Sequence, residues 1–338
     1  MLFICGASGF VGRHLISGLS SRGFSGIAVS RTSLDNLPEG WSWCSRSTVL
    51  SETNLSPGTV IQLEVKQHVD RPTPRDLDAF NAVNVDGTRR WLDWCRTRNI
   101  NHFILFSTIK AVGAAQGSSC ELGDSLPHTP YGKSKLAAEE LVRAWAAEAP
   151  RRSAIILRPA VIYGPGNAAN IYSMVQAIDR KMFFLIGRND NVKSLVSIGN
   201  VVAAVEFMLR NSKPGLHTYN LVDRESFSVR KIASMVAAEL GSSSPIRSIP
   251  PTMAWLAAEL GEVCRQVLGA NPPLTRARLE AMLESTHFSA DKLMAAGFVH
   301  PQDTKEGLRE MVAWYLSSKG DSSKCTGNFI KGPRGIEE

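Results

Sequence analysis

Short, continuous apolar runs alternate with longer amphipathic runs through the first half of the chain. Helical periodicity covers residues 9–23, 76–98 and 131–148. The apolar runs are rich in Val, Ile, Leu and Phe, and they occupy residues 1–5, 26–30, 58–63, 102–107 and 154–158. Uniformly apolar strands separated by helices are typical of a parallel sheet covered on both faces. The pattern predicts an α/β fold, a Rossmann-type doubly wound parallel sheet.

The pattern changes near residue 165, after which helices dominate. Ser228 and Gly241 flank one of these helices as N-cap and C-terminal glycine. The predicted helices are 199–210, 229–240, 252–268, 275–284 and 304–318, and one strand-like run, "HTYNLV", interrupts them at 217–222. We therefore predict an α/β domain over 1–165, a smaller and mainly helical domain over 166–318, and a flexible tail, rich in Gly and Ser, over 319–338.

The predicted helix 252–268 is apolar enough to raise membrane contact as an alternative. Glu259, Glu262, Arg265 and Gln266 interrupt it, so we interpret it as a helix packed in the core. No stretch reaches the roughly 18–20 uninterrupted apolar residues of a membrane span. The first residues lack the charged leader of a signal peptide. These features predict a cytoplasmic protein without a membrane span.

Cysteine, histidine and charge narrow the function classes further. The six cysteines form no C-x-x-C pair and the seven histidines show no metal-ligand spacing, which predicts no metal site and no disulfide framework. The net charge of +7 fits either a solvated basic surface or attraction to anionic ligands such as phosphorylated metabolites. Because no dense Lys/Arg run with interleaved aromatic residues is visible, nucleic acid is not the expected partner.

The first predicted strand leads into "GASGFVG", which places Gly6, Gly9 and Gly12 at the start of a helix. The first glycine permits a tight turn, the second lets the backbone approach a pyrophosphate, and the third lets the helix pack closely. Free N–H groups at the helix start would then face the phosphates. The alternative is a purely structural turn, but the position at the first strand–helix junction favours a dinucleotide site.

The residues after the second strand favour NADP over NAD. An acid there binds the free 2′-hydroxyl of NAD, whereas an arginine accommodates the 2′-phosphate of NADP. The chain has Ser30 and Arg31 at this place, and Asp35 lies too far along. The alternative is a surface arginine in a protein that accepts either cofactor.

Tyr131 and Lys135 are spaced to share one face of the helix 131–148. A free tyrosine has a pKa near about 10, so an adjacent ammonium and an oxidised nicotinamide would be needed to favour the phenolate. Such a tyrosine exchanges a proton with a substrate oxygen while hydride moves. Ser107 and Thr108 end a buried strand at the sheet edge where ligands bind, and a hydroxyl there can orient that oxygen.

At this point the chain resembles a known family, the extended short-chain dehydrogenases/reductases of the NAD-dependent epimerase/dehydratase group. The resemblance is carried by "GASGFVG", "VIQLEVKQHV", "NVDGT", "FILFSTIKAVG", "PYGKSK" and "LRPAVIYGPGN", over residues 6–167. It implies a catalytic triad of Thr108, Tyr131 and Lys135, with Ser107 as the alternative to Thr108. It also implies that the cofactor is held by Gly6, Ser8, Gly9, Phe10, Val11, Gly12, Arg31, Leu63, Asn84, Lys135 and Pro159.

Within this group, "YGPGNAANI" and "KSLVSIGNVV" resemble bacterial nucleotide-sugar 4-epimerases and 4-keto-sugar reductases, which supply surface polysaccharides. The resemblance implies that Asn170 and Lys193 contact the nucleotide and its diphosphate, as does Arg276 or Arg278, beside the triad's Thr108 and Tyr131. Arginine is commoner than lysine at position 193, and a lysine gives no bidentate clamp. The resemblance also implies a possible homodimer.

Two positions depart from the family pattern near the site. "QLEV" at 62–65 stands where the family has "HLAA", so the bulky and charged Glu64 must point away from the cofactor or alter the site. "AVG" at 111–113 stands where the family has "VYG". Neither departure removes a group of the triad.

The sequence thus predicts an NAD(P)-dependent enzyme that transfers hydride at C4 of a nucleotide sugar, by epimerisation or by net reduction of a 4-keto group. The first alternative is a reductase or dehydrogenase of a steroid-like or other apolar alcohol. The second is a dinucleotide sensor without catalysis, although a sensor has no use for the proton donor Tyr131.

Overall fold

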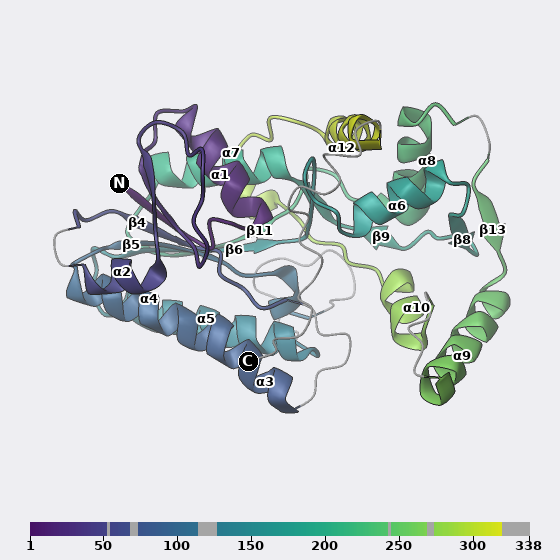
Figure 1. The fold of residues 1–338 in the computed structure, drawn as a ribbon, viewed down its shortest axis with the longest axis horizontal. Helices are drawn as coiled ribbons and strands as arrows, with labels where there is room; N and C mark the ends of the chain where they lie inside the picture. Colours follow the sequence, from purple (N-terminus) through teal and green to yellow (C-terminus); the bar gives the residue numbers. More distant parts are fainter. Residues whose placement is uncertain (53–54, 68–73, 114–126, 243–244, 269–273, 320–338) are drawn as a thin grey trace. The chain divides into compact units, whose positions relative to one another are not determined.

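Seven parallel strands form the central sheet of the protein (Figure 1). The structure is a computed structural model, and it describes residues 1–338 except 53–54, 68–73, 114–126, 243–244, 269–273 and 320–338. The order of the strands is β3-β2-β1-β4-β5-β6-β11. The strands are β1 (Leu2–Cys5), β2 (Gly26–Val29), β3 (Trp41–Cys44), β4 (Thr59–Gln62), β5 (His102–Phe106), β6 (Ser153–Pro159) and β11 (Gly215–Leu221). The chain builds outward from β1 on one side and then crosses to β4 on the other. This reversal confirms the predicted doubly wound sheet, and ligands of such sheets bind at the carboxyl ends of the strands where the order reverses, here β1 and β4.

Helices cover both faces of this sheet. One face carries α1 (Phe10–Ser20) and α7 (Ile198–Arg210), which pack together so closely that a Cβ on Gly18 would lie 2.5 Å from Val202 Cγ1. The other face carries α2 (Arg46–Ser51), α4 (Asp86–Thr97) and α5 (Pro130–Ala147) (Figure 1). Both layers are apolar because the strands are buried on both sides.

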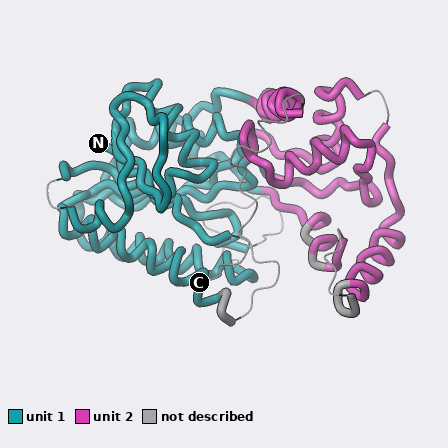
Figure 2. Tube along the Cα trace, in the orientation of Figure 1, with its two compact units in different colours: residues 1–162, 195–224, 288–302 teal, residues 163–194, 225–287, 303–338 magenta. Residues whose placement is uncertain are grey.

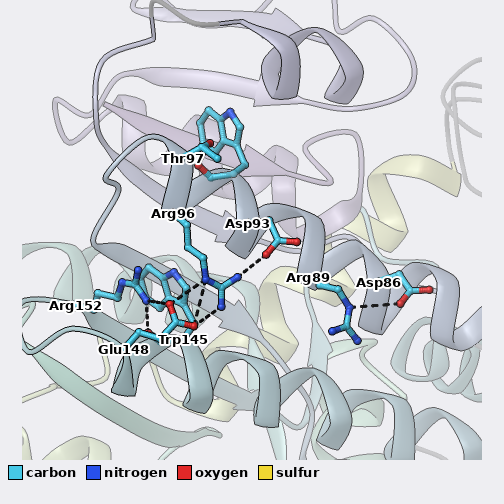
Figure 3. Close-up of polar contacts among 9 residues, drawn as sticks. Asp86, Arg89, Asp93, Arg96, Thr97, Trp145, Glu148 and Arg152 are labelled. Atoms are coloured by element: carbon cyan, nitrogen blue, oxygen red, sulfur yellow. Dashed lines mark hydrogen bonds and ion pairs between the residues drawn. The ribbon is translucent and has the colours of Figure 1, made fainter.

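The helices α4 and α5 are also joined by charged side chains at one end (Figure 3). Arg96 of α4 donates to both carboxylate oxygens of Glu148, at 2.9 and 3.2 Å for its Nε, and Arg152 bonds the same carboxylate. The Arg152 guanidinium lies 4.6 Å from the ring centroid of the buried Trp145. Hydrogen bonds from Arg96 are the main reason that the pKa of Glu148 falls to about 2.

The chain divides into two compact units (Figure 2), neither of which is one continuous stretch. Unit 1 comprises residues 1–162, 195–224 and 288–302, and unit 2 comprises 163–194, 225–287 and 303–338. Residues 195–224 belong to unit 1 because β11 pairs with β6 along its whole length and α7 covers the sheet. The predicted strand 217–222 is therefore part of the main sheet. The predicted tail, apart from Lys319, lies outside the described residues.

Unit 2 contains helices with short strands between them. Its helices are α6 (Asn170–Asp179), α8 (Val229–Glu239), α9 (Pro251–Leu268), α10 (Arg276–Leu283) and α12 (Thr304–Lys319). Its strands are β8 (Phe184–Ile186), β9 (Val192–Lys193), β12 (Phe227–Ser228) and β13 (Arg247–Ile249), paired as β9 with β12 and β8 with β13. Ser228 caps α8, as predicted, by accepting from the Lys231 N–H at 3.2 Å. No helix within the described residues is long and apolar enough to cross a membrane.

The remaining elements refine the predicted boundaries. The predicted helix 76–98 is broken into α3 (Pro74–Phe80), a π-helical turn η1 (Asn81–Val85) and α4. The "WSWC" segment is the edge strand β3, paired in parallel with β2. Shorter elements are the 3-10 turn η2 (Ile109–Ala111), α11 (Asp291–Ala295) and the paired strands β7 (Val161–Tyr163) and β10 (Leu195–Ser197).

Candidate active site

The glycine loop is held flush against the end of β4. Gly6 has a φ of +89°, and a Cβ there would lie 2.9 Å from the Glu64 nitrogen. At Gly12 a Cβ would lie 2.7 Å from the Ala7 backbone, so only glycine lets α1 begin this close to the loop. The first turn of α1 carries no acidic side chain, which leaves its N–H groups available to an anion. This cradle fits the pyrophosphate of a dinucleotide, with Ser8, Gly9, Phe10 and Val11 completing the loop.

Ser30 and Arg31 lie where β2 ends, beside the glycine loop. The buried Ser30 hydroxyl donates to the Thr32 carbonyl at 2.6 Å and accepts from the Trp43 indole at 3.0 Å. The Arg31 side chain is exposed. Ser30 is thus occupied by the protein itself, whereas the exposed Arg31 directly follows it at the end of β2.

Glu64 directs its carboxylate away from the glycine loop. It accepts a hydrogen bond from the Trp91 indole of α4 at 2.9 Å, and it forms an ion pair with Arg46 of α2 at 3.5 Å. Only its backbone approaches Gly6. The neighbouring Leu63 N–H donates to the Cys5 carbonyl at 2.9 Å and holds the two strand ends together. The Glu64 carboxylate, a departure from the family's small residue, is therefore bonded to α2 and α4.

Local sequence fixes the start of α5 directly before Tyr131. The Thr129 hydroxyl accepts from the Gly132 N–H at 3.0 Å, and Pro130 occupies the first helical turn. A Cβ on Gly132 would lie 2.4 Å from the Lys110 carbonyl. The glycine therefore lets the helix start approach the segment that follows β5, which carries Thr108.

Tyr131 is half-buried, and the side chains of Gln67 and Thr108 lie near its phenol. Partial burial raises its pKa to about 12, and these two neighbouring side chains lower the pKa only in part. The protein groups alone therefore hold the proton on Tyr131 at neutral pH. The lowered pKa expected from an adjacent ammonium together with an oxidised nicotinamide is not produced by the protein groups alone, since burial is the largest influence on the Tyr131 pKa.

Lys135 lies one turn further along α5 and is 2% exposed. Burial lowers its pKa to about 8, and the Glu139 carboxylate partly offsets this by raising it. Glu139 is fully buried and accepts from Arg158 of β6 at 2.6 and 2.9 Å. It also accepts from the Ser107 hydroxyl at 2.5 Å. Ser107 is thereby directed to Glu139, and of the two candidate hydroxyls it is Thr108 that meets Tyr131.

Asn84 lies in the π-helical turn and ties three segments together. Its amide oxygen accepts from the Lys66 N–H at 2.9 Å, and its amide nitrogen donates to the Lys66 carbonyl at 3.2 Å. The same nitrogen donates to the Ser134 hydroxyl of α5 at 2.9 Å. Because Lys66 precedes Gln67, these bonds position the Gln67 side chain against Tyr131.

Pro159 ends β6 at the same edge of the sheet, whereas the residues predicted to contact the nucleotide and its diphosphate belong to unit 2. Asn170 begins α6 and is exposed. Lys193 is half-buried in β9, next to the end of α10 through a bridge to Thr286. Arg276 begins α10 and forms an ion pair with Glu259 of α9.

Four of these neighbours were not identified from the sequence: Gln67, Gly132, Glu139 and Arg158. Glu139 alone carries a signal, since it follows Lys135 by one helical turn on the same stripe. Arg158 reaches that stripe from a strand that follows in the chain, and Gln67 reaches Tyr131 from the loop after β4. Only the folded sheet brings these groups together.

The sequence agrees with known proteins along most of its length. Relative to an Escherichia coli O157:H7 enzyme, N-acetyl-alpha-D-glucosaminyl-diphospho-ditrans,octacis-undecaprenol 4-epimerase, it is 27% identical over 95% of this chain and 97% of that one. Relative to the 2-alkyl-3-oxoalkanoate reductase of Stenotrophomonas maltophilia it is 24% identical over 92% and 98% of the two chains.

A solved structure shows the same fold. The protein MoeE5 in complex with UDP-glucose and NAD superposes with a TM-score of 0.71 at 23% identity, over 94% of this chain and 99% of that one. Residues 2–221 match the model of the NAD dependent epimerase/dehydratase family. The chain therefore belongs to the NAD dependent epimerase/dehydratase family and is an enzyme whose cofactor is NAD or NADP.

Proposed function

We propose that the protein is a 4-epimerase of a sugar carried on a diphosphate. The observation that carries this proposal is the placement of Tyr131 next to Thr108, one turn before the buried Lys135, at the sheet edge that also holds the Gly6–Gly12 loop. An acid–base group is thus brought to the edge where a dinucleotide binds in doubly wound sheets. The E. coli relative, whose name includes a diphospho-linked sugar and 4-epimerase activity, supports the choice of reaction.

Tyr131 would act as the general acid and base at the sugar's O4. With its pKa at about 12, it holds a proton at neutral pH and suits donation to a 4-keto oxygen. Thr108 would share that oxygen and orient it. Lys135 would bind the nicotinamide ribose and add positive charge behind the phenol. The chemistry supplied by the bound dinucleotide is the acceptance and return of a hydride, together with a positive charge that favours the phenolate.

The substrate's diphosphate would be met by residues of unit 2. Lys193 supplies one charge, with Asn170 and either Arg276 or Arg278 as further contacts. Lys193, half-buried in β9, is the residue on which we place the diphosphate contact. A lysine binds a phosphate as a point charge and does not form the bidentate contact of arginine.

Arg31 bears on whether the hydride returns to the same sugar. If it selects NADP, an exchanging NADPH would also allow net reduction of a 4-keto sugar. Epimerisation instead needs a dinucleotide that stays bound through both hydride steps. We keep epimerisation as the proposed reaction because the E. coli relative is named for it.

The second candidate is a reductase of a ketone that carries no diphosphate; the Stenotrophomonas relative, named a 2-alkyl-3-oxoalkanoate reductase, supports ketone reduction. The two candidates differ in their need for Lys193. Lys193→Glu should abolish turnover of a diphosphate sugar, because it places a like charge against the phosphate, and should spare an uncharged ketone. Lys305→Glu, on the exposed side of α12, is the matched control.

The proposed function is tested by incubating the purified protein with NAD or NADPH and a panel of UDP-, dTDP- and GDP-sugars, polyprenyl-diphosphate sugars and 2-alkyl-3-oxoalkanoates. Products are identified by mass and NMR. We expect a C4 epimer from at least one diphosphate sugar, without net cofactor consumption. Turnover of the oxoalkanoates alone, with NADPH consumed in step, would replace this proposal by the second candidate.

A further inference from the structure

The helix α9 has one buried face of small residues. Ala254 and Ala258 are fully buried against Ile186 and Leu279, and Gly261 lies on the same side. Such small side chains let the helix sit close to α10 and β8. The sequence had led us to expect a core helix, and this face alone fits that expectation.

The opposite face of α9 is apolar and exposed, which corrects the core-helix interpretation. The exposed fractions are 58% for Met253, 62% for Leu256, 59% for Leu260 and 54% for Val263. At 100° per residue these positions fall on one side of the helix, together with the exposed Ala257 and Cys264. We call these six residues the α9 stripe. It carries no charged side chain.

Basic and apolar exposed groups also lie on β8 and β13, the paired strands of unit 2 that precede α9 in the chain. Phe184 of β8 is 41% exposed and pairs with the exposed Arg247 of β13, the strand that leads into α9. Met182 is 62% exposed, and the exposed Lys181 stands next to it. On α9 itself, Trp255 is 36% exposed but lies about 100° around the helix from Leu256, outside the stripe. Basic groups beside an apolar surface are typical of the boundary between hydrocarbon and lipid headgroups.

Few acidic residues near the α9 stripe would repel an anionic membrane surface. Glu259 flanks the α9 stripe but forms an ion pair with Arg276. The chain as a whole carries a net charge of +7, which favours approach to an anionic membrane surface. The charge is therefore complementary to anionic headgroups.

A second copy of the chain would need a broader surface than the α9 stripe. Stable protein interfaces bury about 800 Å² on each partner, from about 20–30 residues a side. The stripe has six residues on one helix. A helix that lies in the headgroup region needs only such a narrow apolar face, buried by about 5–10 Å.

We propose that the α9 stripe docks the protein on the surface of an anionic lipid bilayer. The surface itself is inferred from unit 2 alone. Its link to catalysis rests on the proposed function: a diphosphate sugar carried on a polyprenol stays in the membrane, and docking would bring the enzyme to it.

The test is flotation of the purified full-length protein with vesicles of phosphatidylcholine containing about a quarter phosphatidylglycerol. The variant Leu256→Glu/Leu260→Glu replaces two exposed leucines, so its fold should be retained. We expect the wild type to float and the variant to bind at least about tenfold more weakly. Val299→Glu is the control, since Val299 is 82% exposed and lies outside α9; it should float like the wild type.

Three results would overturn the docking proposal. The wild type could fail to float, or the double variant could float equally well. Alternatively, light scattering without vesicles could show a wild-type dimer and a monomeric double variant, which would assign the α9 stripe to a second copy. Because flotation uses no substrate, failure of the sugar panel leaves this result standing. Epimerisation of soluble sugars without flotation would overturn docking alone.

Discussion

At the level of single residues, the position of the Tyr131 hydroxyl depends on its immediate neighbours in the chain. Thr129 and Pro130 start α5, and Gly132 admits the backbone that carries Thr108. The Tyr131/Lys135 spacing could be found in the sequence because a helix brings such positions onto one face. The contact with Gln67 could not, because it depends on a loop from another strand.

Arg31 gives the first prediction at this scale. Arg31→Ala should weaken NADP binding by about tenfold or more, the loss of a hydrogen bond to a charged group. NAD binding should change little, since NAD lacks the 2′-phosphate, and it serves as the internal control. Both affinities are read by nucleotide fluorescence titration. An equal loss for the two cofactors would show that Arg31 does not read the 2′-phosphate.

Lys135 gives a prediction about pH. Its pKa is about 8 in the folded protein and near 10.5 when exposed, so between these values the unfolded chain binds more protons. Stability must therefore rise with pH over this window, and the penalty of burying the charge is full below about pH 8. Between pH 8 and pH 10, the unfolding free energy of the wild type minus that of Lys135→Met should increase by about 2 kcal/mol.

The comparison with Lys135→Met cancels the other titrating groups, including Tyr131, whose raised pKa acts above about pH 10. Urea unfolding at several pH values is the measurement. Parallel curves for the two proteins would mean that Lys135 titrates normally.

At the level of elements, strands and helices with a strong apolar pattern were predictable, and those defined by distant partners were not. The strand β3 is an edge strand with only Trp41 buried, so its pattern is weak and its identity comes from pairing with β2. Whether α9 is a core helix depends on which of its faces are covered. The sequence does not show this, because an apolar helix has the same periodicity whether protein or another apolar surface covers it.

The buried pair of Glu139 on α5 and Arg158 on β6 gives the prediction at this scale. Arg158→Met should lower the unfolding free energy by about 3–5 kcal/mol, because it leaves a buried carboxylate without its main partner. The double variant Glu139→Leu/Arg158→Met should recover at least half of that loss. Urea denaturation measures all three proteins. A double variant as unstable as the single one would show that packing, not the uncompensated charge, sets the cost.

At the level of the whole molecule, the two units interleave along the chain. The change from strands to helices near residue 165 was visible in the sequence, but the return of 195–224 and 288–302 to unit 1 was not. That return depends on β11 pairing with β6 and on α7 covering the sheet, which are contacts between distant segments. Pairing of two copies of the chain stays a prediction.

A truncation tests this interleaving. The protein ended at residue 165 should not fold alone, because it lacks β11 and the buried face of α7, which includes Val201, Val202 and Val205. We expect aggregation and no cooperative thermal transition by circular dichroism. The chain ended at residue 319 is the control and should melt like the full protein. A cooperative melt of residues 1–165, with full NADP affinity, would show that 1–165 is an independent domain.

The central claim is that Tyr131 serves a hydride transfer at C4 of a diphosphate-linked sugar. The most direct test is the NMR spectrum of the product formed in D₂O by the wild type and by Tyr131→Phe. We predict inversion at C4 with protium retained there, because the hydride returns without exchanging with solvent. The variant should be slower by about 10²–10⁴-fold while still binding the dinucleotide. Deuterium at C4, or an unchanged rate in Tyr131→Phe, would contradict the claim.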